Sequence, residues 1–214
     1  MNYVKKLKNS YMEKKTFWND AARWGVVLGA LLACSFVVEE LMTNSGRTWL
    51  YGLMLVEWIA VVVLHFWLLL RFARSRAALC SVEEGFTFGQ GYGAVMGVSL
   101  MAGVIVGAVQ TVYLHLILGY EHYIERTIDS MTAMLAQNGS MPKAFEGLFA
   151  TTFEQLRTAP VPSVLQTVWS GLFSTLLFGA VFGLIIAGIT ARAPRPFDSA
   201  GADSDSSTNG EITE

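Results

Sequence analysis

The stretch from Tyr92 to Leu118 contains no charged residue, and this constrains the fold more than any other feature. It holds 27 residues, more than the ~20 with which an α-helix crosses the hydrocarbon of a bilayer. A buried helix of a soluble protein is the alternative, but three further long apolar segments occur in the same chain. Only 15% of the residues are charged and the mean hydropathy is +0.44, whereas soluble domains carry about 25% charged residues. The sequence therefore predicts an all-α integral membrane protein.

Glycines mark one face of this predicted helix. They are Gly93, Gly97, Gly103 and Gly107. At ~100° per residue they fall in a sector roughly 120° wide. The last apolar segment carries small residues at every fourth position, namely Gly171, Thr175, Gly179, Gly183 and Ala187. Small residues spaced in this way let two helices approach closely in lipid, so we expect these two helices to be the closest-packed pair.

Four membrane spans are expected, at about residues 21–38, 49–70, 92–118 and 164–189. Eleven Lys and Arg residues lie on the side of the two termini and the 71–90 linker, and four lie on the other side. Because cytoplasmic loops carry an excess of Lys and Arg, we expect both termini in the cytoplasm. The predicted membrane domain, residues 21–193, is a four-helix bundle with N-in/C-in orientation.

Three segments lie outside the predicted spans. Residues 1–20 are basic and are followed by no signal-cleavage site, which predicts a retained segment that forms either a short amphipathic surface helix or a flexible tail. Residues 119–163 predict an outer hairpin of two amphipathic helices, which either caps the bundle or is simply solvated. The third span could continue into the first of these helices. Residues 194–214 form an acidic, Ser- and Asp-rich tail that predicts disorder.

The entry to the third span, GFTFGQGYGAVMGV, and the closing segment FGAVFGLIIAGITAR resemble a bacterial membrane family. It is catalogued as domain of unknown function four-one-nine-nine. The resemblance covers roughly residues 20–195 and implies a location in the bacterial inner (cytoplasmic) membrane, but it implies no activity or site. The longer basic N-terminal segment and the acidic tail depart from the family pattern.

Glu57 is the one acidic residue well inside a predicted span. A charged side chain there costs roughly 2.5–3.5 kcal/mol on insertion scales, so it should face the bundle and have a partner. Depth matching offers Gln110, Ser174 or Thr175, while His65 lies about 12 Å further along the helix and is too far away. The hypothetical intramembrane polar cluster comprises Glu57, His65, Gln110, His115 and Thr175. The simpler interpretation is a protonated Glu57 that joins two helices by one hydrogen bond.

The sequence contains no metalloprotease, nucleophile-elbow, phosphate-loop or dinucleotide-binding motif in a suitable context. Cys34 and Cys80 lie at different depths, and we expect no metal site, cofactor, catalytic residue or nucleic-acid partner. Two functions remain besides an unsupported intramembrane enzyme. The first is a non-catalytic scaffold or accessory subunit that binds lipids and a partner membrane protein. The second is a small homo-oligomeric transporter or channel with Glu57 in the conduction path.

Overall fold

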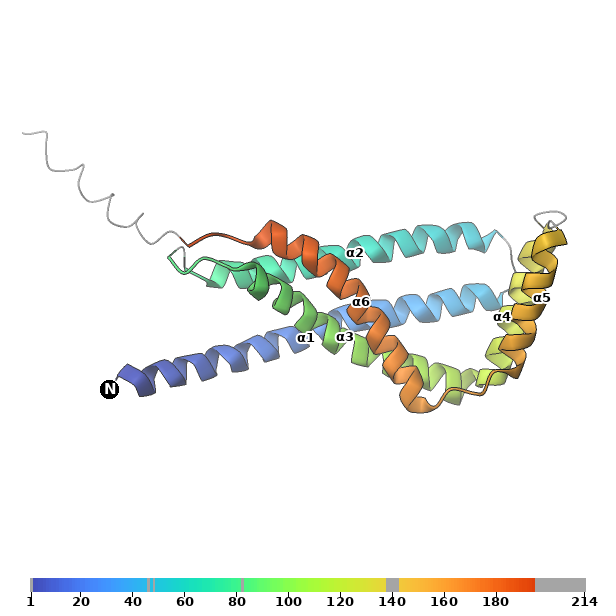
Figure 1. Cartoon of the computed structure of the whole chain (residues 1–214), viewed down its shortest axis with the longest axis horizontal. Coiled ribbons are helices and arrows are strands. Elements are labelled where there is room, and N and C mark those ends of the chain that lie inside the picture. Colours follow the sequence, from blue (N-terminus) through green and yellow to red (C-terminus); the bar gives the residue numbers. More distant parts are fainter. Residues whose placement is uncertain (1, 46, 48, 82, 138–142, 195–214) are drawn as a thin grey trace, which may run out of the picture.

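The computed structural model describes residues 2–45, 47, 49–81, 83–137 and 143–194, and every named element in these ranges is helical (Figure 1). The elements are α1 (Asn2–Asn44), α2 (Leu50–Leu79), α3 (Phe88–Thr111), the π-helical turn η1 (Val112–Leu118), α4 (Tyr120–Gln137), α5 (Lys143–Thr158) and α6 (Val164–Thr190).

Four helical stretches of the described residues are long and apolar enough to cross a membrane. They are Thr16–Thr43, Gly52–Leu79, Phe88–Leu118 and Val164–Thr190. The prediction of an all-helical protein with four candidate membrane-spanning helices is therefore confirmed. The second of them ends later than expected, because the Arg-containing segment after Leu70 continues as helix to Leu79.

The basic N-terminal segment belongs to the first long helix. α1 begins at Asn2 and continues without a break through the first span to Asn44. It is neither the separate surface helix nor the flexible tail that the sequence suggested. No Gly or Pro occurs before Gly25, and Lys, Leu and Met favour helix, so nothing in this segment breaks the helix.

The third span does not continue into the outer hairpin. Gly119 has φ 81° and ψ 133°, which ends η1, and α4 begins at the next residue. A residue with a side chain rarely adopts this backbone conformation, whereas glycine does so readily. α4 and α5 then lie side by side across one end of the long helices (Figure 1). The helix stop expected at Asn138–Gly139 falls outside the described residues.

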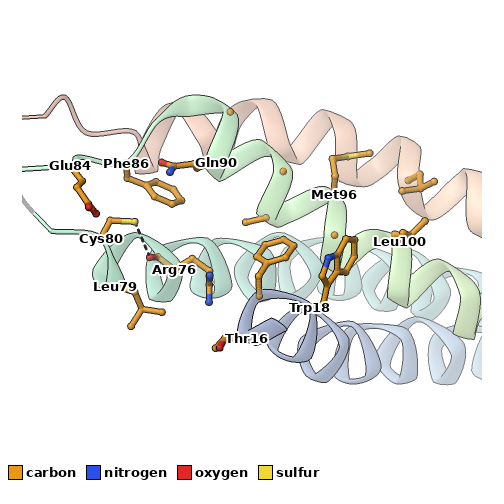
Figure 2. Close-up of a pocket in the computed structure, with 16 residues that line it drawn as sticks. Thr16, Trp18, Arg76, Leu79, Cys80, Glu84, Phe86, Gln90, Met96 and Leu100 are labelled. Carbon is orange, nitrogen blue, oxygen red and sulfur yellow. Dashed lines mark hydrogen bonds between the residues drawn. The ribbon is translucent and has the colours of Figure 1, made fainter. Parts of the chain in front are cut away.

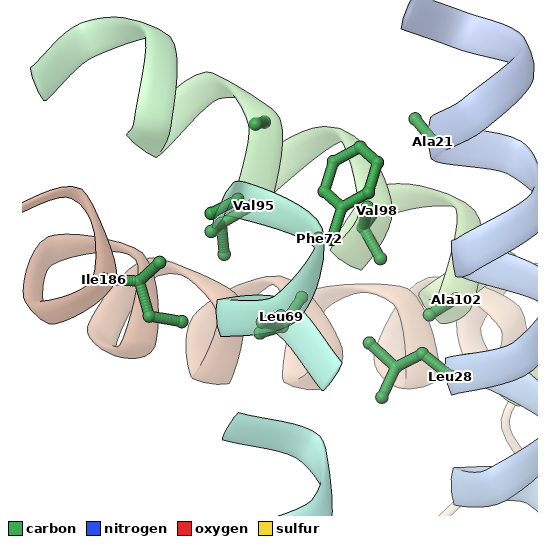
Figure 3. Packing of buried hydrophobic residues seen from close by; sticks show 10 residues of the cluster. Ala21, Leu28, Leu69, Phe72, Val95, Val98, Ala102 and Ile186 are labelled. Carbon is green, nitrogen blue, oxygen red and sulfur yellow. The ribbon is translucent and has the colours of Figure 1, made fainter. Parts of the chain in front are cut away.

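α3 is the central helix. It makes its most extensive contact with α6 and the next most extensive with α1, while α2 packs against α1, α3 and α6. Apolar side chains from all four long helices meet beside α3, as Figure 3 shows for Leu28, Leu69, Phe72, Val95 and Ile186. We call the two ends of the molecule the Phe86 end, where α2 is joined to α3, and the α4–α5 end.

Candidate functional site

The α3–α6 contact brings the two backbones together at glycines. A Cβ atom on Gly171 would lie 2.6 Å from the Cα of Gly107, and a Cβ on Gly107 would collide with the carbonyl oxygen of Val168. A Cβ on Gly103 would lie 3.0 Å from the Cα of Leu172. Side chains of α3 instead fill the space opposite the later α6 glycines, with Ser99 against Gly179 and Tyr92 against Gly183.

The other two glycines of the predicted α3 face do not contact α6. Gly97 faces α1, where a Cβ would meet the ring of Phe17 at 3.2 Å. A Cβ on Gly93 would have no atom of a described residue within 4 Å, and Gly93 lies on the wall of a groove instead. The glycine face of α3 is thus shared between α6, α1 and open space.

Glu57 has a different partner from those expected. The Ser35 hydroxyl on α1 donates a 2.6 Å hydrogen bond to Glu57 Oε1. Neither oxygen of the Glu57 carboxyl group is bonded to the expected partners Gln110, Ser174 and Thr175. Glu57 Oε2 is buried without a hydrogen-bond partner among the described residues. The carboxyl group of Glu39, one helical turn after Ser35, interacts electrostatically with that of Glu57.

His65 lies apart from Glu57, inside the contact of α2 with α6. Its ring is 4% exposed and stands edge-on to Phe182, with ring centroids 5.2 Å apart. His65 Nε2 and the hydroxyl of the fully buried Ser99 both lack a hydrogen-bond partner among the described residues. These are two isolated polar atoms in an otherwise apolar interior.

The remaining members of the predicted polar cluster lie along the α3–α6 contact. His115 Nε2 is 3.0 Å from the hydroxyl of Thr167. The Thr175 hydroxyl donates to the carbonyl oxygen of Gly171 at 2.9 Å, and the Gln110 side-chain oxygen lies beside Gly171. The five residues therefore occupy three separate places rather than one cluster.

An electrostatic interaction that the sequence analysis missed links α4 to α1. Glu40 interacts electrostatically with Arg126 and with Tyr123, both on α4. Burial, and secondarily the charge of Glu40, raises the pKa of the Tyr123 hydroxyl above its ordinary value. Charge complementarity between Glu40 and Arg126 was visible in the sequence, but nothing there indicated that the two residues interact.

The GFTFGQG segment forms a structural clasp at the Phe86 end. Phe86 exchanges two backbone hydrogen bonds with Arg192, of 3.0 and 2.7 Å. Gly85 has φ 68°, and a Cβ there would lie 2.7 Å from the Arg192 carbonyl oxygen, so only glycine fits. Thr87 and Gln90 form a reciprocal capping box that starts α3. The T-x-x-Q spacing is the signal that could have revealed this cap.

A groove of about 860 Å³ lies beside this clasp and was also missed (Figure 2). Its apolar lining includes Trp18, Phe86, Met96 and Leu100. Its polar lining comprises Thr16, Arg76, Cys80, Glu84 and Gln90. The Arg76 guanidinium forms a 3.2 Å ion pair with Asp20 and lies 5.4 Å from the centre of the Phe17 ring, so it is held in place from two sides.

Neither cysteine of the chain is in a disulfide. Within the described ranges, no group of three or more His, Cys, Asp and Glu side chains is placed to hold a metal ion.

Three long apolar helices assembled around a fourth, α3, define the class: a multi-pass helical membrane protein. A family model described as "protein of unknown function (DUF4199)" matches residues 23–192, so the chain belongs to this family. The resemblance based on the α3 entry and the end of α6 is confirmed. No curated protein and no solved structure matches the chain.

Proposed function

We propose that this protein is a non-catalytic scaffold or accessory subunit of a complex in the bacterial inner membrane, and that it docks a partner membrane protein along α2. The observation that carries this proposal is the outward face of α2. Eight large apolar side chains on it are each at least 43% exposed: Leu53, Leu55, Val56, Trp58, Ile59, Val63, Leu64 and Trp67.

Several features suit this face to a protein partner. In the part of α2 nearest the α4–α5 end, the side-chain hydrogen bonds found among the described residues come from α1. The Ser35 hydroxyl donates to Glu57, and the Thr43 hydroxyl donates to the sulfur of Met54. The Glu57 carboxyl group thus points towards α1, and the outward side of this part of α2 is apolar. Trp58 and Trp67 offer the large, rigid rings that are enriched in protein interfaces, and Arg71 lies over the Trp67 ring at 5.3 Å.

The distribution of Lys and Arg supports an orientation with the Phe86 end in the cytoplasm. In that orientation the α4–α5 hairpin lies on the opposite side of the membrane, where it covers the end of α1. The partner would then be a membrane-spanning protein that contacts α2 within the bilayer, with the soluble parts free on either side.

Site-specific photo-crosslinking in native membranes tests this proposal. A photoreactive residue at Ile59 or Val63 should yield a discrete protein adduct. The matched controls are Phe173 and Leu177 on α6, which are 61% and 58% exposed and should yield only lipid adducts. A homodimer adduct from α2 would identify the partner as a second copy. Lipid adducts alone from both helices would refute the scaffold proposal.

A transporter or channel is the second candidate, and the paired carboxyl groups of Glu39 and Glu57 favour it. Against it, Leu28, Leu69 and Phe72 are buried almost completely and close the interior on the Phe86 side of Glu57. A proteoliposome flux assay of the Glu57→Gln variant decides whether Glu57 takes part in conduction. Unchanged ion or proton flux removes Glu57 from any conduction path.

A further inference from the structure

The groove at the Phe86 end has an apolar part and a charged part, arranged along α3. Glu84 and Arg76 lie nearer the Phe86 end, while Trp18, Met96 and Leu100 lie further along the long helices (Figure 2). Its volume of about 860 Å³ falls in the ~300–1,000 Å³ range of small-molecule sites. This division matches an amphiphile with a charged head and an apolar chain.

The length of the groove matches one leaflet of a bilayer. Its α3 lining runs from Gly89 to Leu100, which at 1.5 Å per residue is about 16 Å. That is roughly half of the ~30 Å hydrocarbon core. A partner helix that spans the membrane needs a groove of about twice this length. A single acyl chain in one leaflet needs only this much.

Glycines, which carry no side chain, form part of the groove wall along α3. Among the described residues, a Cβ atom on Gly89 or Gly93 would have no neighbour within 4 Å, so no described side chain fills the space beside them. One helical turn further on, Gly97 is closed off by Phe17 of α1. The open part of the wall thus lies next to the charged residues.

The charges select the head group. Arg76 donates one hydrogen bond to Asp20, and a guanidinium carries five N–H donors, so it has capacity for a phosphate as well. Glu84 supplies a carboxylate on the same groove. The two charged side chains that line the groove, Arg76 and Glu84, sum to zero, which suits a zwitterionic head group. A primary ammonium can donate hydrogen bonds to Glu84, whereas a quaternary ammonium cannot.

We propose that this groove is a binding site for a zwitterionic phospholipid with a primary amine, in which the phosphate meets Arg76, the ammonium meets Glu84 and one acyl chain lies over Gly89 and Gly93. The site is separate from the α2 face, and the proposal is independent of the scaffold function.

Native mass spectrometry of the purified full chain tests it, with phosphatidylethanolamine, phosphatidylcholine and phosphatidylglycerol of identical acyl chains as probes. We expect the ethanolamine lipid to be retained about tenfold more tightly than either other lipid, a factor that corresponds to about 1.4 kcal/mol. Equal retention of the three lipids, or a protein dimer that excludes them, would overturn the proposal.

Variants locate the site. Gly93→Leu fills the groove and should reduce retention of the ethanolamine lipid at least tenfold. Gly188→Leu is the matched control, because a Cβ there also has no neighbour within 4 Å and Gly188 lies outside the groove lining. Glu84→Gln, at an exposed position, should abolish the preference for ethanolamine over choline even if Gly93→Leu fails to fold. A preference that survives Glu84→Gln would refute the assignment of the head group.

Discussion

Gly107 shows at the scale of one residue why the α3–α6 contact needs glycine. A Cβ atom there collides with the backbone of Val168, which cannot rotate away as the end of a flexible side chain can. Gly171 stands opposite and is equally tight. In a bilayer, moving an apolar side chain from lipid into a helix contact gains little free energy. Close backbone packing therefore supplies much of the helix–helix attraction.

The first prediction concerns this residue. Gly107→Val should destabilise the folded protein by about 1–3 kcal/mol, the usual cost of overpacking. Thermal unfolding in detergent measures the effect. Gly188→Val is the control, since a side chain at Gly188 meets no atom within 4 Å. Equal unfolding temperatures for the two variants would show that the backbones do not meet at Gly107.

Glu57 illustrates what sequence reasoning about single residues leaves out. Its depth and its need for a partner follow from the sequence, because an intramembrane carboxyl group is costly when alone. Depth alone does not say which neighbouring helix supplies the partner. That depends on how α2 is rotated and on its packing against α1, which the nearly uniform apolar surface of the helix does not encode. Ser35, one of several small polar residues at suitable depths, was therefore not identifiable.

At the scale of elements, helix ends were encoded more clearly than helix contacts. Thr87 with Gln90 and Ser163 with Gln166 form capping boxes that start α3 and α6, and both spacings are visible in the sequence. The break at Gly119 was also marked by its residue type, yet glycines occur throughout α3 without breaking it. The positive φ of Gly119 distinguishes it from the glycines within α3, and residue type alone does not reveal this conformation.

The second prediction tests the electrostatic interaction of α4 with α1. Burial and the charge of Glu40 both raise the pKa of Tyr123, so Glu40→Gln should lower that pKa towards the ordinary value without reaching it. Tyrosinate absorbance against pH measures this change, with Tyr123→Phe used to assign the signal. Glu121→Gln is the control, because Glu121 is exposed on α4 and is not among the groups that shift the pKa of Tyr123.

The sign of the linked stability change follows from the same shift. Because folding raises the pKa of Tyr123, the protein should lose stability as the pH rises from the unfolded pKa of about 10 to the higher folded value. The Tyr123→Phe variant should lack this part of the loss. A Tyr123 pKa that is the same in the wild type and in Glu40→Gln would contradict the electrostatic interaction between α4 and α1.

At the scale of the whole molecule, the number of long apolar helices and the central position of α3 followed from hydropathy and glycine spacing. The groove did not. It lies where α1 diverges from α3 towards the Phe86 end (Figure 1). There Gly93 has no neighbour among the described residues, although Gly93 and Gly97 share the spacing of four that predicts close packing. A small-residue pattern indicates where a helix can be approached, while the angles between helices decide what approaches it.

The third prediction concerns the orientation of the molecule in the membrane. Two variants, Gln155→Cys on α5 and Ser81→Cys before α3, each place one thiol at an exposed position, near opposite ends of the molecule. Both are made in a protein that also carries Cys34→Ala and Cys80→Ser. In intact spheroplasts, a membrane-impermeant maleimide should label Gln155→Cys, whereas Ser81→Cys should react only after lysis. This outcome follows if the eleven Lys and Arg residues on the side of the Phe86 end hold it in the cytoplasm. The reverse pattern would invert the orientation and would move the amine-lipid site to the outer leaflet.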